Sequence, residues 1–212
     1  MPKPLTVTLL RKTTLKQKQK TEMKQLNIIL ALFQTIISSG QEANITNEIR
    51  KDFNVYSNLI AERKIDDALN YSNPKLFEIV PREQRKNLME AVYNMPNIEY
   101  RTGTATFLKF EELKKIENVN YVKFYIKSPI EMKFTDIENT EEKVLQMTKN
   151  FEAKFGVGNV EFDKKSGFYK VNAEKIIIAS SDNELLDWKF VTVDNPKMKA
   201  LLERFIPSEL LN

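Results

Sequence analysis

The residue types in this chain restrict the chemistry available to it. Its 212 residues include no histidine and no cysteine. This composition excludes imidazole catalysis, Ser-His-Asp and Cys-His nucleophile systems, His- or Cys-ligated haem and the usual structural zinc sites. Acid–base chemistry would have to come from Asp, Glu, Tyr or Lys side chains, and we expect no cofactor.

Several short motif matches are attributed to chance or to local structure. Residues 72–75 and 181–183 match the S-x-x-K and S-D-N elements of β-lactamases and penicillin-binding proteins, but in the wrong order and in a short chain. Gly156 and Gly158 lack the third glycine of a dinucleotide-binding loop. The acidic residues between 136 and 142 lack EF-hand spacing and suit the first turn of a helix, so no metal site is expected.

The apolar spacing predicts helices in the first part of the chain. Five residues recur at helical spacing: Ile45, Ile49, Phe53, Tyr56 and Ile60. A short helix at 65–69 and a short strand at 76–80 follow. Prolines flank a further helix at 82–94, and three of its residues are expected to face inward: Leu88, Val92 and Met95.

Beyond Asn97 the period changes to two, which is typical of strands with one solvated face. Strands are predicted at 98–110, 119–128, 130–134, 160–163, 168–180 and 186–193. Pro129 is expected at a bulge or bend and not at a central position of the sheet. With helices at 144–155 and 196–205, the predicted class is α+β. N-terminal helices pack on a curved, mostly antiparallel sheet, with an inserted helix and a C-terminal helix.

The N-terminal region has the pattern of a secretory signal peptide. A basic start at Met23-Lys24 precedes an apolar stretch from Leu26 to Ile37 and then the small residues Ser38-Ser39-Gly40. The apolar stretch is shorter than the ~20 residues that a membrane-spanning helix needs. We therefore expect cleavage between Gly40 and Gln41.

This interpretation divides the chain into a basic leader at 1–22, a signal peptide at 23–40 and a single domain at 41–212. The leader is either a long basic n-region or the result of a translation start placed too early. We favour the second alternative, with translation from Met23. A third alternative is a cytosolic protein with a disordered basic arm and a buried first helix.

Processing would also change the net charge. Residues 1–24 contain seven of the 33 basic residues and one of the 29 acidic residues, so a chain of net charge +4 would become a domain of about −2. The basic balance is therefore no sign of nucleic-acid binding, and nucleic acid is not an expected partner. The mature chain would have no stable membrane anchor and would be periplasmic or extracellular.

The order of the elements resembles the nuclear transport factor 2-like superfamily, whose members have a cystatin-like, cone-shaped fold. The resemblance covers roughly residues 45–193. It rests on a long first helix, the segment RKIDDAL at 63–69, the turn at Pro74, a third helix and long curved strands. The helix at 144–155 and the helix after the last strand depart from the family pattern. The chain also resembles exported bacterial proteins.

The resemblance implies a conical pocket between the sheet and the helices. Four aromatic residues are the candidates for ligand binding there: Tyr56, Phe124, Trp188 and Phe190. Trp188, the sole tryptophan, has a core position between sheet and helix as its alternative. An isomerase-type site would need a carboxylate base and a donor for the oxyanion. The candidates are Glu78, Glu99 or Glu131 for the base and Tyr56, Tyr93, Tyr100 or Tyr125 for the donor.

These observations predict an exported, non-catalytic protein that binds a small molecule or an envelope protein in a concave sheet pocket. A small lyase or isomerase that uses a Glu–Tyr pair is the alternative from another class. A structural envelope protein with a filled core is a third. A buried, unpaired carboxylate in a cavity would favour the enzyme, whereas an apolar cavity without one would favour binding.

Expression in a bacterial host from Met1 and from Met23 tests the export prediction. We expect both products to be found outside the cytoplasm with an N-terminus near Gln41, as determined by cell fractionation, intact mass and N-terminal sequencing. An uncleaved cytoplasmic chain beginning at Met1 would contradict the signal-peptide interpretation and would make nucleic acid a candidate partner again.

Overall fold

A computed structural model describes residues 44–182 and 184–211, apart from the side chain of Lys197. The predicted leader, the signal peptide and the cleavage position at Gly40 and Gln41 lie outside these residues. The chain from Ile45 onwards forms one compact unit.

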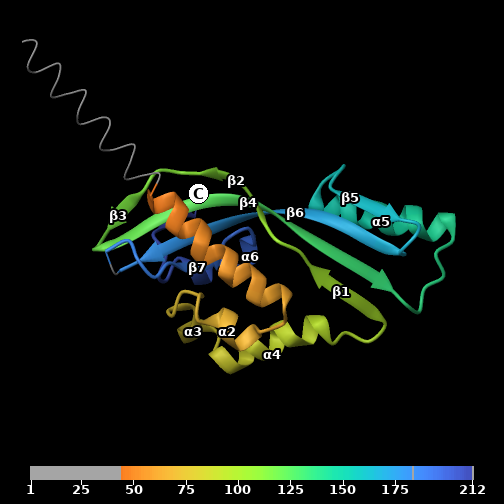
Figure 1. Cartoon of the computed structure of the whole chain (residues 1–212), viewed down its shortest axis with the longest axis horizontal. Coiled ribbons are helices and arrows are strands. Elements are labelled where there is room, and N and C mark those ends of the chain that lie inside the picture. The colour runs from red at the N-terminus through yellow and green to blue at the C-terminus, as the bar shows by residue number, and fades with distance from the viewer. Residues whose placement is uncertain (1–43, 183, 212) are drawn as a thin grey trace, which may run out of the picture. The chain divides into compact units, whose positions relative to one another are not determined.

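Two long strands form the centre of the sheet. β4 (Val119–Phe134) and β6 (Phe168–Ser181) pair antiparallel, and the pairing runs from Asn120 to Met132 of β4 without a shift in register. Figure 1 shows this twisted pair running through the whole unit. Every other strand pairs with one of these two.

Five shorter strands complete the sheet, and each pairs antiparallel with its long neighbour. β1 (Ile98–Thr102), β2 (Thr106–Phe110) and β3 (Lys114–Ile116) pair with β4, whereas β5 (Val160–Asp163) and β7 (Lys189–Thr192) pair with β6. The predicted strand at 160–163 is therefore confirmed with its bounds.

Helices precede, interrupt and follow the sheet. In the described part of the chain, four helices come before the sheet: a first helix over residues 44–61, α2 (Ile65–Leu69), α3 (Leu76–Ile79) and α4 (Arg82–Tyr93). The inserted helix α5 (Glu141–Phe155) lies between β4 and β5. The chain continues after the sheet with α6 (Pro196–Leu202) and the 3-10 helix η1 (Ser208–Leu210). The α+β class is confirmed, with its N-terminal helices, inserted helix and C-terminal helix. Among the described helices, none has the length and apolar character needed to cross a membrane.

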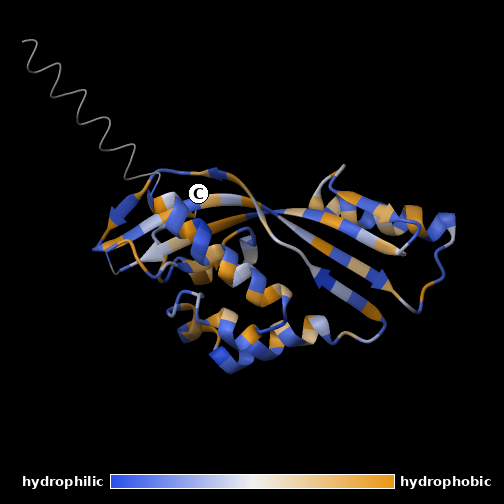
Figure 2. Cartoon of the chain, viewed as in Figure 1, coloured by the Kyte–Doolittle hydropathy of each residue, from blue (hydrophilic) through white to orange (hydrophobic). Residues whose placement is uncertain are grey.

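The sheet is covered on both faces at the end where the first helix packs. The main core joins that helix to one face through buried residues: Ile45, Ile49, Phe53, Ala105, Val122, Phe124, Ile126, Ile177, Ala179, Trp188 and Phe190. On the other face, Tyr121 and Ile178 pack against Ile206 and Leu210 of the C-terminal segment. Strand alternation separates the two sets. Figure 2 shows hydrophobic and hydrophilic residues interleaved along these elements.

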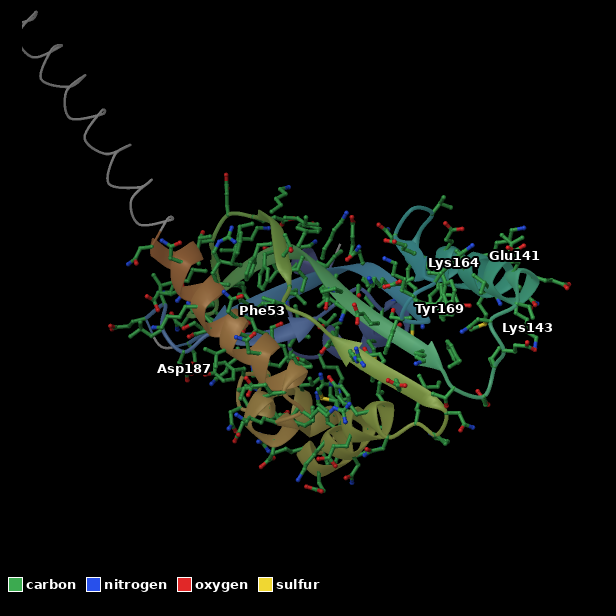
Figure 3. The ribbon with its side chains drawn as sticks, turned by 45° about the vertical axis from the view of Figure 1, so that its right-hand side comes forward. Phe53, Glu141, Lys143, Lys164, Tyr169 and Asp187 are labelled. Atoms are coloured by element: carbon green, nitrogen blue, oxygen red, sulfur yellow. The ribbon has the colours of Figure 1, made fainter. Side chains whose placement is uncertain are left out.

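The inserted helix α5 covers the far end of the same sheet. Its first turn contains Glu141 and Glu142, whose charges suit the positive end of the helix dipole, and Gly156 caps its C-terminus with φ 94°. Phe151 packs against Tyr169 of β6, with ring centroids 5.4 Å apart. Figure 3 shows Glu141 and Tyr169 together at this end, away from Phe53.

One predicted strand is a helix. Residues 76–80 contain α3, which begins with a turn in which Phe77 N–H donates to the carbonyl of Pro74 (3.0 Å). The fixed φ of proline suits the first turn of a helix. Leu76 is buried against β7 and α6. A short apolar run carries no periodicity that separates strand from helix, and the tertiary packing decided.

The prediction that Pro129 lies at a bulge or bend and not in a central position is wrong. Pro129 lies in the middle of β4, opposite Asn172. Its carbonyl accepts a hydrogen bond from Gly103 N–H (3.1 Å). Since N–H and C=O of one residue point to the same neighbour in an antiparallel sheet, the missing N–H faces residues 103–105, between β1 and β2. The irregularity is in the neighbouring strand, and the predicted strand at 98–110 is interrupted there.

Gly103 is required at this interruption. A Cβ atom on residue 103 would lie 2.9 Å from Cγ of Pro129, which is closer than side-chain packing allows. The proline ring and the glycine backbone therefore fit together where β4 changes its partner from β2 to β1.

Substitution of Phe53 tests the packing of the main core. It is 3% exposed, and its ring centroid lies 5.1 Å from that of Phe190 and 5.2 Å from that of Phe124. We expect Phe53→Ala to lower the free energy of unfolding by about 3–5 kcal/mol, because it leaves a cavity, and Phe53→Leu to lower it less. Urea denaturation measures both.

Val55→Ala on the same helix is the control, because Val55 is 41% exposed and its change should cost less than about 1 kcal/mol. Equal losses for Phe53→Ala and Val55→Ala would contradict the packing of the first helix on the sheet.

Candidate functional site

A cavity of about 220 Å³ lies between the sheet, the first helix and α4. Sixteen residues line it: Phe53, Tyr56, Ser57, Ile60, Met89, Val92, Tyr93, Tyr100, Thr102, Gly103, Ala105, Ile126, Ser128, Lys175, Ile177 and Thr192. The walls are largely apolar and aromatic. The polar groups are hydroxyls and one ammonium group.

The two long strands supply the floor of the cavity. Ile126 and Ser128 of β4, and Lys175 and Ile177 of β6, are at alternate positions and therefore face the same side of the sheet. In the register, Ile126 lies opposite Lys175. The continuous β4–β6 pairing thus decides which side chains reach the cavity.

The helices supply the roof. Met89, Val92 and Tyr93 have the i, i+3, i+4 spacing that places them on one face of α4. The prediction that Leu88 and Met95 face inward is wrong, because they are 58% and 44% exposed. The helix is rotated so that the tyrosine and its neighbours cover the cavity.

Three tyrosines surround the cavity. The hydroxyl of Tyr93 donates to the carbonyl of Ile60 (2.9 Å) and lies 3.4 Å from Oγ1 of Thr102. The rings of Tyr93 and Tyr100 meet edge to face at 5.3 Å. Burial raises the pKa of Tyr100 to about 12, with a smaller contribution from Tyr93. The hydroxyl of Tyr100 is therefore neutral, and so a hydrogen-bond donor, at physiological pH.

Tyr56 has a cationic neighbour. Burial raises the pKa of its hydroxyl, and the guanidinium of Arg85 on α4 opposes that shift. Nε of Arg85 is buried and has no hydrogen-bond partner among the residues described. The helix side of the cavity thus has a positive charge close to a phenol.

Lys175 is the one charged residue in the described cavity wall. Burial lowers the pKa of its ammonium group, and the carboxylate of Asp194 opposes the shift. Burial likewise raises the pKa of Asp194, with Lys175 opposing. Lys175 forms no hydrogen bond or ion pair with any described residue. The side chain of Lys175 is half-buried, and a partly desolvated cation without a direct partner costs stability.

The structure separates the four aromatic residues predicted to bind a ligand. Tyr56 lines the cavity, whereas Phe124, Trp188 and Phe190 lie in the core beside it. Trp188 is fully buried and precedes β7 instead of lying in a strand. Its backbone N–H donates to Oδ2 of Asp52 (3.2 Å). Trp188 therefore has the core position that was the alternative for it.

None of the three glutamates named as bases lines the cavity. Glu78 and Glu99 are exposed, and Glu99 pairs with Arg101 (3.5 Å). Glu131 lines a separate hollow of about 180 Å³ next to β5. Of the donor candidates, Tyr93 and Tyr100 join Tyr56 in the cavity.

Tyr125, the fourth donor candidate, is outside the cavity lining. Its side chain is on the opposite face of β4 from Ile126. Its hydroxyl donates to Oε1 of Glu111 (2.7 Å). A Glu–Tyr pair thus exists, but away from the cavity.

The lining therefore suits binding better than acid–base chemistry. No carboxylate is among its described residues. Over residues 44–182 and 184–211, no three acidic side chains gather in a way that could hold a metal ion. Phenols, aliphatic hydroxyls and an ammonium can hold the polar end of a molecule whose body contacts the apolar walls.

Lys175, Ser128 and Thr102 were missed as site residues. The alternation that places Ile126 and Ile177 in the core also places Ser128 and Lys175 on that face, so a signal was present. A lysine in a strand is ordinarily on the solvated face, so Lys175 was not considered as a residue of the cavity.

Comparisons with known proteins leave the family open. No protein-family model matches this chain, and no curated protein or solved structure matches it either.

Tyr100 provides a test of the buried cavity wall. Because its folded-state pKa is about 12, above the ordinary value of 10.0, the folded state retains a proton that the unfolded state loses between these pH values. Stability from this group should decrease as pH rises through that window. We expect Tyr100→Phe to remove one late transition from an ultraviolet absorbance titration of the folded protein.

Tyr71→Phe is the comparison, because Tyr71 is outside the cavity wall. An unchanged late transition in Tyr100→Phe would show that Tyr100 is solvated and would contradict the described wall.

Proposed function

We propose that this protein binds a small, mainly apolar ligand in the cavity between the sheet and the helices and does not convert it chemically. The observation that carries the proposal is the lining itself. It combines apolar and aromatic walls with hydroxyls and one ammonium, and no carboxylate is among its described residues. Ligand sites commonly have this combination of an apolar body and few polar groups.

The size of the cavity limits the ligand. At about 220 Å³ it is smaller than the ~300–1,000 Å³ of sites for drug-sized molecules. A ligand of a few to about a dozen heavy atoms suits this volume. Phe53, Tyr56 and Tyr100 offer ring faces and edges to such a molecule.

The proposal includes the compartment predicted from the N-terminal region. An exported protein would meet its ligand in the periplasm or outside the cell. A cone-shaped arrangement like that of the nuclear transport factor 2-like superfamily is part of the same proposal. The helices that cover one face of the curved sheet support it.

The alternative enzyme lacks its expected base in the cavity. Asp194 is the carboxylate that interacts with the cavity through Lys175, and it is not part of the lining. The alternative of a filled structural core is less well supported than binding, because the cavity remains between the sheet and α4.

Binding of the neutral fluorescent dye 1-aminonaphthalene, whose size is within this limit, to the full chain tests the proposal. We expect saturable fluorescence enhancement with one site. Ser57→Leu, which puts a larger side chain into the cavity wall, should weaken binding at least about tenfold, a change worth ~1.4 kcal/mol.

Asn58→Leu is the matched control, because Asn58 is the next residue on the helix and is exposed. It should bind the dye like the unmodified protein. Absence of saturable binding, or equal weakening by both variants, would count against a ligand site in this cavity.

A further inference from the structure

We propose that the natural ligand is a small apolar carboxylic acid and that Lys175 binds its carboxylate. The inference rests on the proposed function, because it concerns the same cavity. It adds the chemical class of the ligand and the residue that selects it.

The first argument is the position of Lys175. Its side chain belongs to the cavity wall, with Ile126 opposite it in the ladder and Ile177 two residues along the strand. It makes no ion pair with a described residue, and Asp194 interacts with it only beyond direct pairing distance. Lys175 is half-buried, and a cation that is partly removed from water is stabilised by a nearby negative group. A carboxylate bound in the cavity would be that group.

The second argument is the charge around the rest of the cavity. Arg85 lies beside Tyr56 and has a buried Nε without a partner among the described residues. The guanidinium of Arg63 lies 5.1 Å from the ring centroid of Tyr93. Neither arginine forms an ion pair in the described part of the chain. Lys175 in the lining and Arg85 beside Tyr56 thus place positive charge at a cavity whose described lining has no acid, and Asp194 offsets part of it from outside the lining. This distribution of charge favours an anion over an amine.

The third argument is the supply of hydrogen-bond donors. The hydroxyl of Tyr100 has no hydrogen-bond partner among the described residues, and Ser128 also faces the cavity. A carboxylate accepts several hydrogen bonds, and bonds to an ionised acceptor are stronger than those to a neutral one. Ser128 lies two residues from Ile126, the ladder partner of Lys175, so Lys175 and Ser128 are the groups placed to contact the carboxylate.

The remaining lining suits the body of the acid. Phe53, Ile60, Met89, Val92 and Ile177 provide an apolar surface between the first helix, α4 and the sheet. An alkyl chain or a single ring would fill this part of a cavity of about 220 Å³. An alcohol of the same length would make the same apolar contacts but would leave Lys175 without a counter-charge.

Displacement of 1-aminonaphthalene from the full chain by octanoate and by 1-octanol at pH 7 tests the inference. The two competitors share the alkyl chain and differ in the charge of the head group, since carboxylic acids are ionised at this pH. We expect the concentration of octanoate that displaces half of the dye to be at least about tenfold lower than that of 1-octanol. In Lys175→Met, which keeps most of the length of the side chain and removes the charge, this preference should disappear while dye binding persists.

Lys127→Met is the matched control, because Lys127 is on β4, faces the other side of the sheet and pairs with the exposed Glu174 (3.5 Å). It should retain the preference for octanoate. Lys175→Gln provides a second neutral variant of Lys175, and circular dichroism checks the fold of each variant.

The outcomes separate the two proposals. If the dye binds but octanoate and octanol compete equally, the ligand class is wrong and the binding function stands. A preference for octanoate that survives in Lys175→Met and Lys175→Gln would overturn the role of Lys175. If the dye does not bind at all, both proposals fail.

Discussion

The antiparallel pairing of β4 with β6 is the constraint on which the rest of the structure depends. All the other strands attach to one of these two, and the helices pack on the faces that they create. Because the register between them runs without a shift, side-chain alternation is preserved along their whole length. If the register of β6 against β4 shifted by one residue, the side chains of β6 that now face the cavity would lie on the opposite face of the sheet, which the C-terminal segment covers.

Different groups of side chains pack on the same face of the β4–β6 pair at its two ends. At the α5 end, Tyr169 packs with Phe151 and Phe162, with ring centroids 5.4 and 4.7 Å from its own. At the other end, Phe53 fills the space between the first helix and β4. The cavity lies beside this second core, where Gly103 interrupts the neighbouring strand and Tyr100 and Tyr93 form the wall. Aromatic side chains thus pack at both ends of this face of the sheet, and the cavity between them remains unfilled.

The cavity is also where the chain departs from ordinary stability rules. A lysine lies on the apolar face of the sheet, a tyrosine hydroxyl faces the cavity without a described partner, and Nε of Arg85 is buried unpaired. Each of these costs stability unless something compensates it. Departures of this kind concentrate at functional sites. Nε1 of Trp188, in the core beside the cavity, is likewise buried without a partner among the described residues.

The class of the fold and much of its element order follow from the amino-acid sequence alone. Period-two alternation identified β5 and most of β4 and β6, and the proline-flanked helix at 82–94 is α4 within one residue. These signals are local, because alternation and helical spacing depend on neighbours along the chain. The absence of histidine and cysteine excluded whole classes of chemistry without any structure.

The composition of the candidate site depends on packing between elements that are distant in the sequence. Tyr56, Tyr93 and Tyr100 were identifiable by type, but Glu78, Glu99 and Glu131 were equally plausible by type and lie elsewhere. The rotation of α4, the helical state of residues 76–79 and the central place of Pro129 each depend on partners distant in sequence. Lys175 belongs to the cavity because its strand is buried between two others and under helices. Its environment is a property of that packing, which no local pattern specifies.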